Sequence, residues 1–259
     1  MPIRSFAVLA ENSAVWHADA LARPAGDVLA TGHAALDAQL PGGGWPVGAV
    51  VEILQPPGGQ NEWRLLLPAL ARSAPGPVVL VGAPHIPFGP GLAPQGLAAE
   101  RLLCITAAQP APRLWACEQA LRCADVAAVL AWLPQVRADQ LRRLQMAASE
   151  HAKLLFVLRP AQAQAGSSPA VLRLLVSLRP GSDDLQLEVI KRRGPPCTQA
   201  ITMPARAGRL AALIARSQVR AGHGTRPGGM ALKTMQGPGA QPSVGKVGDV
   251  LDCITTSAA

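Results

Sequence analysis

The residues with the most recognisable chemistry lie in a Gly/Pro-rich turn, where residues 55–62 read Gln-Pro-Pro-Gly-Gly-Gln-Asn-Glu between a β-branched run and an apolar helical segment. A strand, a loop and a helix in this order can direct backbone N–H groups at an anion bound near the helix N-terminus. A working phosphate-binding loop reads G-x-x-x-x-G-K-[ST]. The residues at its four defining positions are here Gln55, Gln60, Asn61 and Glu62.

The last two of these substitutions remove the groups that handle phosphate and metal. Asn61 is an amide where a lysine would meet the β- and γ-phosphates. Glu62 is a carboxylate where a hydroxyl would hold Mg²⁺, and its negative charge would repel a phosphate. The turn keeps Gly58 and Gly59 and therefore the frame of a nucleotide site. We expect this degenerate loop to bind neither a cofactor nor a metal ion.

The residues before the loop carry a longer pattern. Thr31–Asp37 reads T-G-x-x-x-L-D, a Gly-rich connection follows, and Pro46–Ile53 reads P-x-G-x-x-V-E-I. This stretch resembles the opening of the RecA core, and residues 31–217 are similar to the ImuA family, the RecA-like proteins of bacterial mutagenesis cassettes. The resemblance implies an α/β fold with a RecA-like core.

The same resemblance assigns three further catalytic positions, and none of them holds a suitable residue. Pro84 stands where RecA has the glutamate that positions the attacking water. Leu130 stands where the Walker B strand has its metal-binding aspartate, and Arg159 stands where a glutamine senses the γ-phosphate. Phosphoryl transfer depends almost wholly on electrostatic positioning, so these losses predict that the chain is not an enzyme.

The alternation of apolar runs and helical patterns also favours an α/β fold with a mainly parallel central sheet flanked by helices. We expect an N-terminal arm over residues 1–30, one RecA-like domain over 31–217 and a disordered Gly/Pro-rich tail over 218–259. The expected strands are 50–54, 77–81, 101–105, 124–133 and 153–158, followed by a C-terminal antiparallel hairpin of 171–178 and 185–191. The expected helices are a segment from residue 61 that Pro68 kinks or breaks, 113–123, 138–152 and a last core helix over 210–217.

Composition narrows the class of protein further. The 259 residues carry a net charge of +8 and a sequence pI of about 10.1. This balance suits a polyanion or an acidic partner, although an arginine-rich proteome explains it equally well. The five cysteines show no C-x-x-C spacing and the five histidines are scattered, which disfavours disulfides and metal centres. With no signal peptide and no membrane span in the sequence, we expect a soluble cytoplasmic protein.

Two groups of basic residues are candidate contacts for DNA or an acidic partner. Arg142 and Arg143 lie on the expected helix 138–152, where a solvated helix face is the favoured interpretation. An ion pair between Asp139 and Arg143 is expected on that helix. Lys191, Arg192 and Arg193 form the densest basic cluster of the chain. Residues 161–170 contain no Lys or Arg where RecA carries a DNA-binding loop, so that loop is not expected to bind DNA.

The resemblance implies a non-catalytic accessory role in SOS-induced, error-prone translesion DNA synthesis. Its implied partners are an ImuB-type Y-family-like protein and an error-prone DNA polymerase III alpha-type subunit, with RecA as a further candidate. The alternative is a cell-division inhibitor similar to SulA, which has a related degenerate RecA-like fold and binds FtsZ. The fuller RecA-like opening of this chain favours the first reading.

Overall fold

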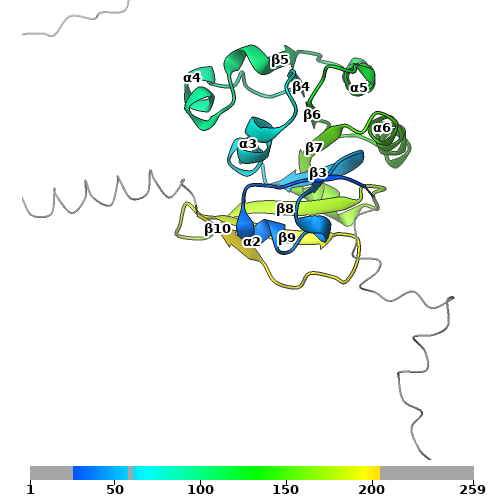
Figure 1. The fold of residues 1–259 in the computed structure, drawn as a ribbon. Helices are drawn as coiled ribbons and strands as arrows, with labels where there is room; N and C mark the ends of the chain where they lie inside the picture. The colour runs from blue at the N-terminus through cyan, green and yellow to red at the C-terminus, as the bar shows by residue number, and fades with distance from the viewer. Residues whose placement is uncertain (1–25, 58–60, 205–259) are drawn as a thin grey trace, which may run out of the picture. The chain divides into compact units, whose positions relative to one another are not determined.

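Six parallel strands form the centre of one eight-stranded sheet, and two antiparallel strands extend it (Figure 1). The computed structural model describes residues 26–57 and 61–204. The strand order is β10-β9-β8-β3-β7-β6-β4-β5, with antiparallel pairing only between β8 and β9 and between β9 and β10. The strands are β3 (Ala49–Gln55), β4 (Val78–Val81), β5 (Leu102–Ile105), β6 (Ala128–Trp132), β7 (Leu154–Pro160), β8 (Leu172–Leu178), β9 (Leu185–Lys191) and β10 (Ile201–Met203). The prediction of a mainly parallel sheet with a C-terminal antiparallel extension is confirmed.

Helices and short turns connect these strands and cover both faces of the sheet. The α-helices are α2 (Ala34–Asp37), α3 (Glu62–Arg72), α4 (Gly89–Leu92), α5 (Pro110–Arg122) and α6 (Ala138–Glu150). The 3₁₀ turns are η2 (Pro41–Gly43), η3 (Ala93–Gln95), η4 (Ala99–Arg101) and η5 (Ala161–Ala165). Before the main sheet, β1 (Val28–Leu29) pairs antiparallel with β2 (Trp45–Pro46).

Two hydrophobic clusters lie on the opposite faces of the sheet. One contains the inward side chains of α2 and α3 together with Trp45 and Phe156, whose rings meet edge to face at 5.3 Å. The other contains the buried faces of α5 and α6. Successive residues of β3 alternate between the clusters, because side chains of a strand point to opposite faces. Coverage on both sides explains why the central strands are almost uniformly apolar.

The T-G-x-x-x-L-D motif fastens the start of the domain to α3. The Asp37 carboxylate accepts a hydrogen bond from the Thr31 amide at 2.8 Å. Gly32 has φ +89°, and a Cβ there would lie 2.5 Å from the Cβ of Pro68. Glycine is therefore required both by the backbone conformation and by the close approach to the helix. The His33 ring contacts the carbonyl oxygen of Leu65 at 3.2 Å.

Of the two outcomes predicted for Pro68, a kink or a break, the break is wrong, because α3 continues through Pro68 to Arg72. A proline within a helix leaves the carbonyl four residues earlier without its usual donor. That carbonyl belongs to Arg64. The opening motif packs beside it, with Gly32 close to Pro68 and the His33 ring on the Leu65 carbonyl.

Other boundaries differ modestly from the predicted ones. Helix α5 begins at Pro110, three residues before the predicted start, because proline is well accommodated in the first turn of a helix. Strand β6 is confined to Ala128–Trp132 rather than 124–133. The expected helix 210–217, the tail and residues 1–25 of the expected arm lie outside the described residues. Within the described ranges, no helix is long and apolar enough to cross a bilayer.

Candidate functional site

The degenerate loop connects the end of β3 to the start of α3, and the polar groups at its two ends bind each other. Gln55 is buried, and its side-chain oxygen accepts a hydrogen bond from the Asn61 amide at 3.0 Å. Its side-chain nitrogen donates to the Glu62 carboxylate at 3.3 Å. The Gln55 side chain therefore satisfies one of the amide groups that a phosphate would otherwise bind at a helix N-terminus. Residues 58–60, which include Gly58, Gly59 and Gln60, lie outside the described residues.

The other positions assigned by the resemblance also lack catalytic groups. Pro84 follows β4 and is exposed. Leu130 is fully buried inside β6, two residues before the strand ends at Trp132. Over the described part of the chain, no three His, Cys, Asp or Glu side chains are grouped so as to hold a metal ion.

Burial raises the pKa of the Cys117 thiol to about 12, so this thiol is protonated at neutral pH and is a poor nucleophile.

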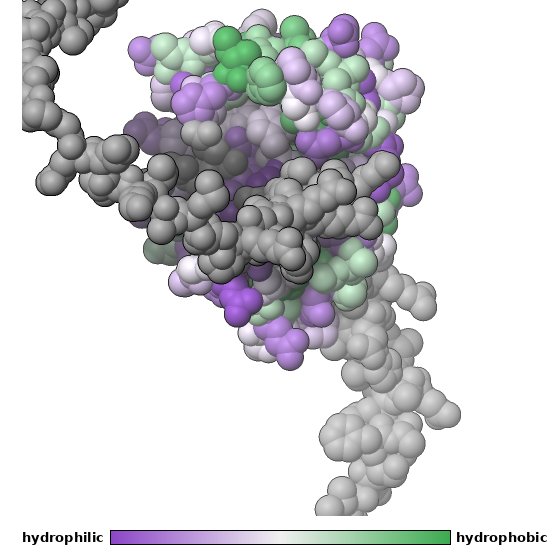
Figure 2. Space-filling model, turned by 90° about the vertical axis from the view of Figure 1, so that its left-hand side faces the viewer, coloured by the Kyte–Doolittle hydropathy of each residue, from purple (hydrophilic) through white to green (hydrophobic). Residues whose placement is uncertain are grey.

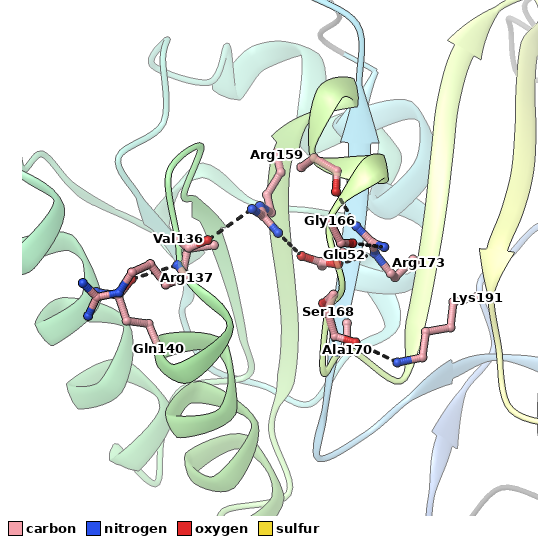
Figure 3. A network of polar contacts seen from close by, with 11 residues as sticks. Glu52, Val136, Arg137, Gln140, Arg159, Gly166, Ser168, Ala170, Arg173 and Lys191 are labelled. Atoms are coloured by element: carbon pink, nitrogen blue, oxygen red, sulfur yellow. Dashed lines mark hydrogen bonds and ion pairs between the residues drawn. The ribbon is translucent and has the colours of Figure 1, made fainter.

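Arg159 lies at the end of β7 and belongs to a buried charge cluster (Figure 3). One of its terminal nitrogens donates to the Glu52 carboxylate at 2.6 Å, and the other donates to the Val136 carbonyl at 3.1 Å. Glu52 lies in β3 and has no solvent exposure. The residue that stands at the γ-phosphate-sensing position is therefore held by an internal carboxylate.

Arg173 of β8 binds the same carboxylate from the other side. Its Nε lies 2.6 Å from the second oxygen of Glu52, a close ion pair although the N–H is not aligned as a hydrogen bond. Its two terminal nitrogens donate to the carbonyls of Gly166 and Ala163, at 3.0 and 2.7 Å. Because Glu52 and Arg173 are register partners on adjacent parallel strands, the sheet itself brings them together. We call Glu52, Arg159 and Arg173 the buried triad.

Two cationic side chains of neighbouring strands hold the segment that the resemblance compares with a DNA-binding loop. Residues 161–170 connect β7 to β8, and Arg173 binds two of their carbonyls (Figure 3). The Lys191 ammonium donates to the carbonyl of Ser168 at 2.8 Å. Arg173 and Lys191 together thus bind three carbonyls of this segment.

Sequence reasoning missed this triad, although a signal was present. Charged residues are almost never fully buried unless they are paired. Glu52 lies within an otherwise apolar, β-branched run, and Arg173 lies within the apolar run of the expected hairpin. A search for an opposite charge in the neighbouring strands could have proposed the pair. Only the strand order could have assigned β7 and β8 as those neighbours.

The structure separates the basic residues that were expected to contact DNA or a partner. Arg142 is exposed on α6, whereas Arg143 forms an ion pair with Glu118 of α5 at 2.8 Å. The predicted pair of Asp139 with Arg143 is therefore wrong, and Asp139 instead pairs with Arg137 at 3.2 Å. Side chains on adjacent helices reach one another here as readily as side chains one turn apart.

In the second basic group, Arg192 is committed to the backbone. It donates to the carbonyls of Pro195 and Gln39. Arg193 is exposed and lines, with Arg192, a cavity of about 450 Å³ whose other wall includes Gln145 and Ser149 of α6. This cavity lies at the amino edge of β3, the opposite edge from Gln55, and so it does not adjoin the degenerate loop.

The fold defines an α/β protein with a mainly parallel central sheet, flanked by helices and extended by antiparallel strands. No protein-family model matches the chain. Two proteins named Protein ImuA, from two strains of Caulobacter vibrioides, are each 31% identical to it over 219 residues, covering 77% of this chain and 87% of theirs. The chain belongs to the ImuA family.

Proposed function

We propose that this protein is a non-catalytic, RecA-like accessory factor of error-prone translesion DNA synthesis that acts through protein contacts. Membership of the ImuA family supports the mutagenesis pathway. The partners that we propose are an ImuB-type Y-family-like protein and an error-prone polymerase alpha subunit, with RecA as a third candidate. The family assignment favours this role over cell-division inhibition of the SulA type.

One observation carries the non-catalytic part of this proposal. The buried Gln55 side chain joins the first amide of the loop helix to the Glu62 carboxylate, at the place where phosphate and Mg²⁺ would bind. A triphosphate at this position would have to displace those hydrogen bonds and approach a buried negative charge. The buried triad supports the same conclusion, because Arg159 is already held by Glu52.

Calorimetric titration of the full chain with ATP and Mg²⁺ tests the nucleotide prediction. We expect no heat of binding at micromolar protein and nucleotide concentrations, and no release of phosphate above that of a protein-free control. Micromolar affinity or nucleotide-stimulated turnover would contradict the proposal.

Deletion of the gene in its native host tests the pathway. Damage-induced mutation frequency should fall on deletion, and co-purification from damaged cells should recover the ImuB-type protein. Unchanged mutagenesis together with altered septation would instead favour the division-inhibitor alternative.

A further inference from the structure

A hollow of about 180 Å³ lies at the carboxyl edge of the sheet, next to the degenerate loop. Its walls come from the start of α3, the end of β6 and the segment after β4, and its lining residues are Glu62, Trp63, Trp132 and residues 84–88. Small-molecule pockets typically measure roughly 300–1,000 Å³. This hollow is therefore suited to one side chain rather than to a nucleotide.

The hollow contains a buried negative charge. Glu62 is only 5% exposed. Its one recorded hydrogen bond comes from the neutral Gln55 amide, and among the described residues no Lys, Arg or His forms an ion pair with it. The positive end of the α3 dipole makes the carboxylate tolerable in this position. A cationic guest would gain a charge-assisted hydrogen bond there that the protein itself does not supply.

Aromatic residues from three elements line the same hollow as Glu62. Trp63 belongs to α3, Trp132 ends β6, and Phe88 precedes α4. Cations bind to the faces of aromatic rings, and Trp is the strongest such partner. Arg combines stacking on aromatic rings with planar recognition of a carboxylate, so the guanidinium group fits this combination better than a lysine ammonium does.

The rim of the hollow is apolar and unusually exposed. Ile86 is 89% exposed and Phe88 is 74% exposed. In the view of Figure 2, hydrophobic side chains gather on the upper part of the molecule, at the height of α4 and β5. Apolar contacts around a buried charged anchor exclude water and are typical of the energetic centre of a protein interface.

One arginine at this edge, Arg113, is already hydrogen-bonded to the backbone. Its side chain donates to the carbonyl of Trp132 at 3.3 Å and also to that of Ala107. It lines a separate hollow together with Leu133 and Val136. Since no arginine of residues 26–57 and 61–204 forms an ion pair with Glu62, its carboxylate can still accept a guanidinium group.

We propose that the Glu62 hollow binds an arginine side chain presented by an extended segment of a partner protein. The inference deepens the proposed protein-contact function and rests on it. At the position where a phosphate-binding loop has a hydroxyl group for Mg²⁺, this chain has the Glu62 carboxylate beside aromatic residues. The electrostatic preference of the site is therefore for a cation rather than an anion. The recognised group is a guanidinium, and the apolar rim contacts the residues beside it.

Titration of the ¹⁵N-labelled full chain with the peptide acetyl-Gly-Arg-Gly-amide tests the proposal. The indole N–H resonances of Trp63 and Trp132 should shift in a saturable manner, whereas that of Trp115, which lies exposed on α5, should not. The matching citrulline peptide has nearly the same shape without the charge and should bind about tenfold more weakly or less. Equal binding of both peptides, or shifts centred on Trp115, would overturn the proposal.

Two variants connect the binding to the hollow. Glu62→Gln should weaken arginine-peptide binding about tenfold or more. Trp132→Leu should also abolish the shift at Trp63, while the matched surface variant Trp115→Leu should bind as the wild type does; circular dichroism checks the fold of each. Unchanged binding by Glu62→Gln or by Trp132→Leu would refute the assignment. Because the titration needs no cellular partner, its result is independent of the mutagenesis assay that tests the proposed function.

Discussion

Two buried glutamates, ten residues apart in the sequence, have opposite electrostatic surroundings. Glu52 lies in β3 between two arginines, and both of its oxygens are within 2.6 Å of a guanidinium nitrogen. Glu62 begins α3 and receives a hydrogen bond from a neutral amide. Both oxygens of the Glu52 carboxylate are paired with arginines of the protein. The Glu62 carboxylate has no such cation among the described residues and can pair with an incoming one.

This difference separates a structural charge from a recognition charge. Buried ion pairs contribute little net stability compared with apolar residues of similar volume. Removal of one partner is nevertheless strongly destabilising, because the other charge is left buried without a counter-ion. Glu52 is thus needed because Arg159 and Arg173 are present, and Arg173 in turn binds the loop between β7 and β8. No arginine or lysine of the described residues forms an ion pair with Glu62. Evolution of this site toward a new ligand would therefore leave the sheet intact.

Removal of the Glu52 charge should give the largest effect. Glu52→Gln leaves two arginines buried with no anion, and we expect a loss of about 3–5 kcal/mol in the free energy of unfolding. Urea denaturation followed by circular dichroism measures it. Glu188→Gln is the matched control, because Glu188 lies exposed on β9 of the same sheet and should change stability by less than about 0.5 kcal/mol.

The triad can also be replaced as a unit. The triple variant Glu52→Met, Arg159→Met, Arg173→Met removes all three charges of the buried triad and should regain most of the stability that Glu52→Gln loses. Its loop 161–170 should exchange amide hydrogens faster than in the wild type, because the Arg173 hydrogen bonds to Ala163 and Gly166 are gone. A triple variant as unstable as the single one would show that the charges are not the source of the loss.

A third ionisable side chain, His33, needs no counter-ion because its ring remains neutral. Burial lowers the pKa of its ring below 6.5, outweighing the opposing effect of the Leu65 and Arg64 carbonyls. The unfolded chain therefore binds the proton more tightly, so the stabilisation from this group is complete above pH 6.5 and is lost as pH falls from there through the folded pKa. His33→Gln keeps an N–H donor but cannot titrate.

The wild type should accordingly lose more stability than His33→Gln between pH 7.5 and pH 5.5, by at most about 1.4 kcal/mol for each pH unit. Urea midpoints at the two pH values measure the difference. His85→Gln is the control, because His85 is exposed. A His33→Gln variant with the same loss of stability as the wild type would place the acid sensitivity in other groups.

Much of the fold could be predicted from the sequence because its central strands are apolar on both faces. Runs such as 77–81 and 153–158 are long enough for a strand and too short for a helix, and both form parallel strands. The continuity of α3 through Pro68 could not be predicted, because the helix surface beside it packs on residues such as His33, which lies 35 residues earlier in the chain. Local propensity carries no information about such a contact.

For the candidate site, the sequence yields only a prediction of what the loop does not bind. That prediction rests on the residue types at Asn61 and Glu62. They do not reveal that Phe88 and Trp132, from segments 26 and 70 residues beyond Glu62, line the same hollow. That arrangement follows from the strand order, in which β4 and β6 are neighbours. Recognition sites built across a sheet edge are for this reason harder to derive than motifs that are contiguous in sequence.

Neutralising Glu62 should have the smallest effect on folding and so gives the sharpest contrast with Glu52. Glu62→Gln keeps a side-chain oxygen that accepts the Gln55 hydrogen bond. It loses only the favourable interaction of the carboxylate with the α3 dipole, and it leaves no cation of the described residues without a counter-ion. We expect the free energy of unfolding to change by less than about 1 kcal/mol, measured by urea denaturation beside Glu52→Gln. A loss as large as that of Glu52→Gln would mean that Glu62 is a structural charge after all, because only a hidden dependence on the carboxylate could produce it.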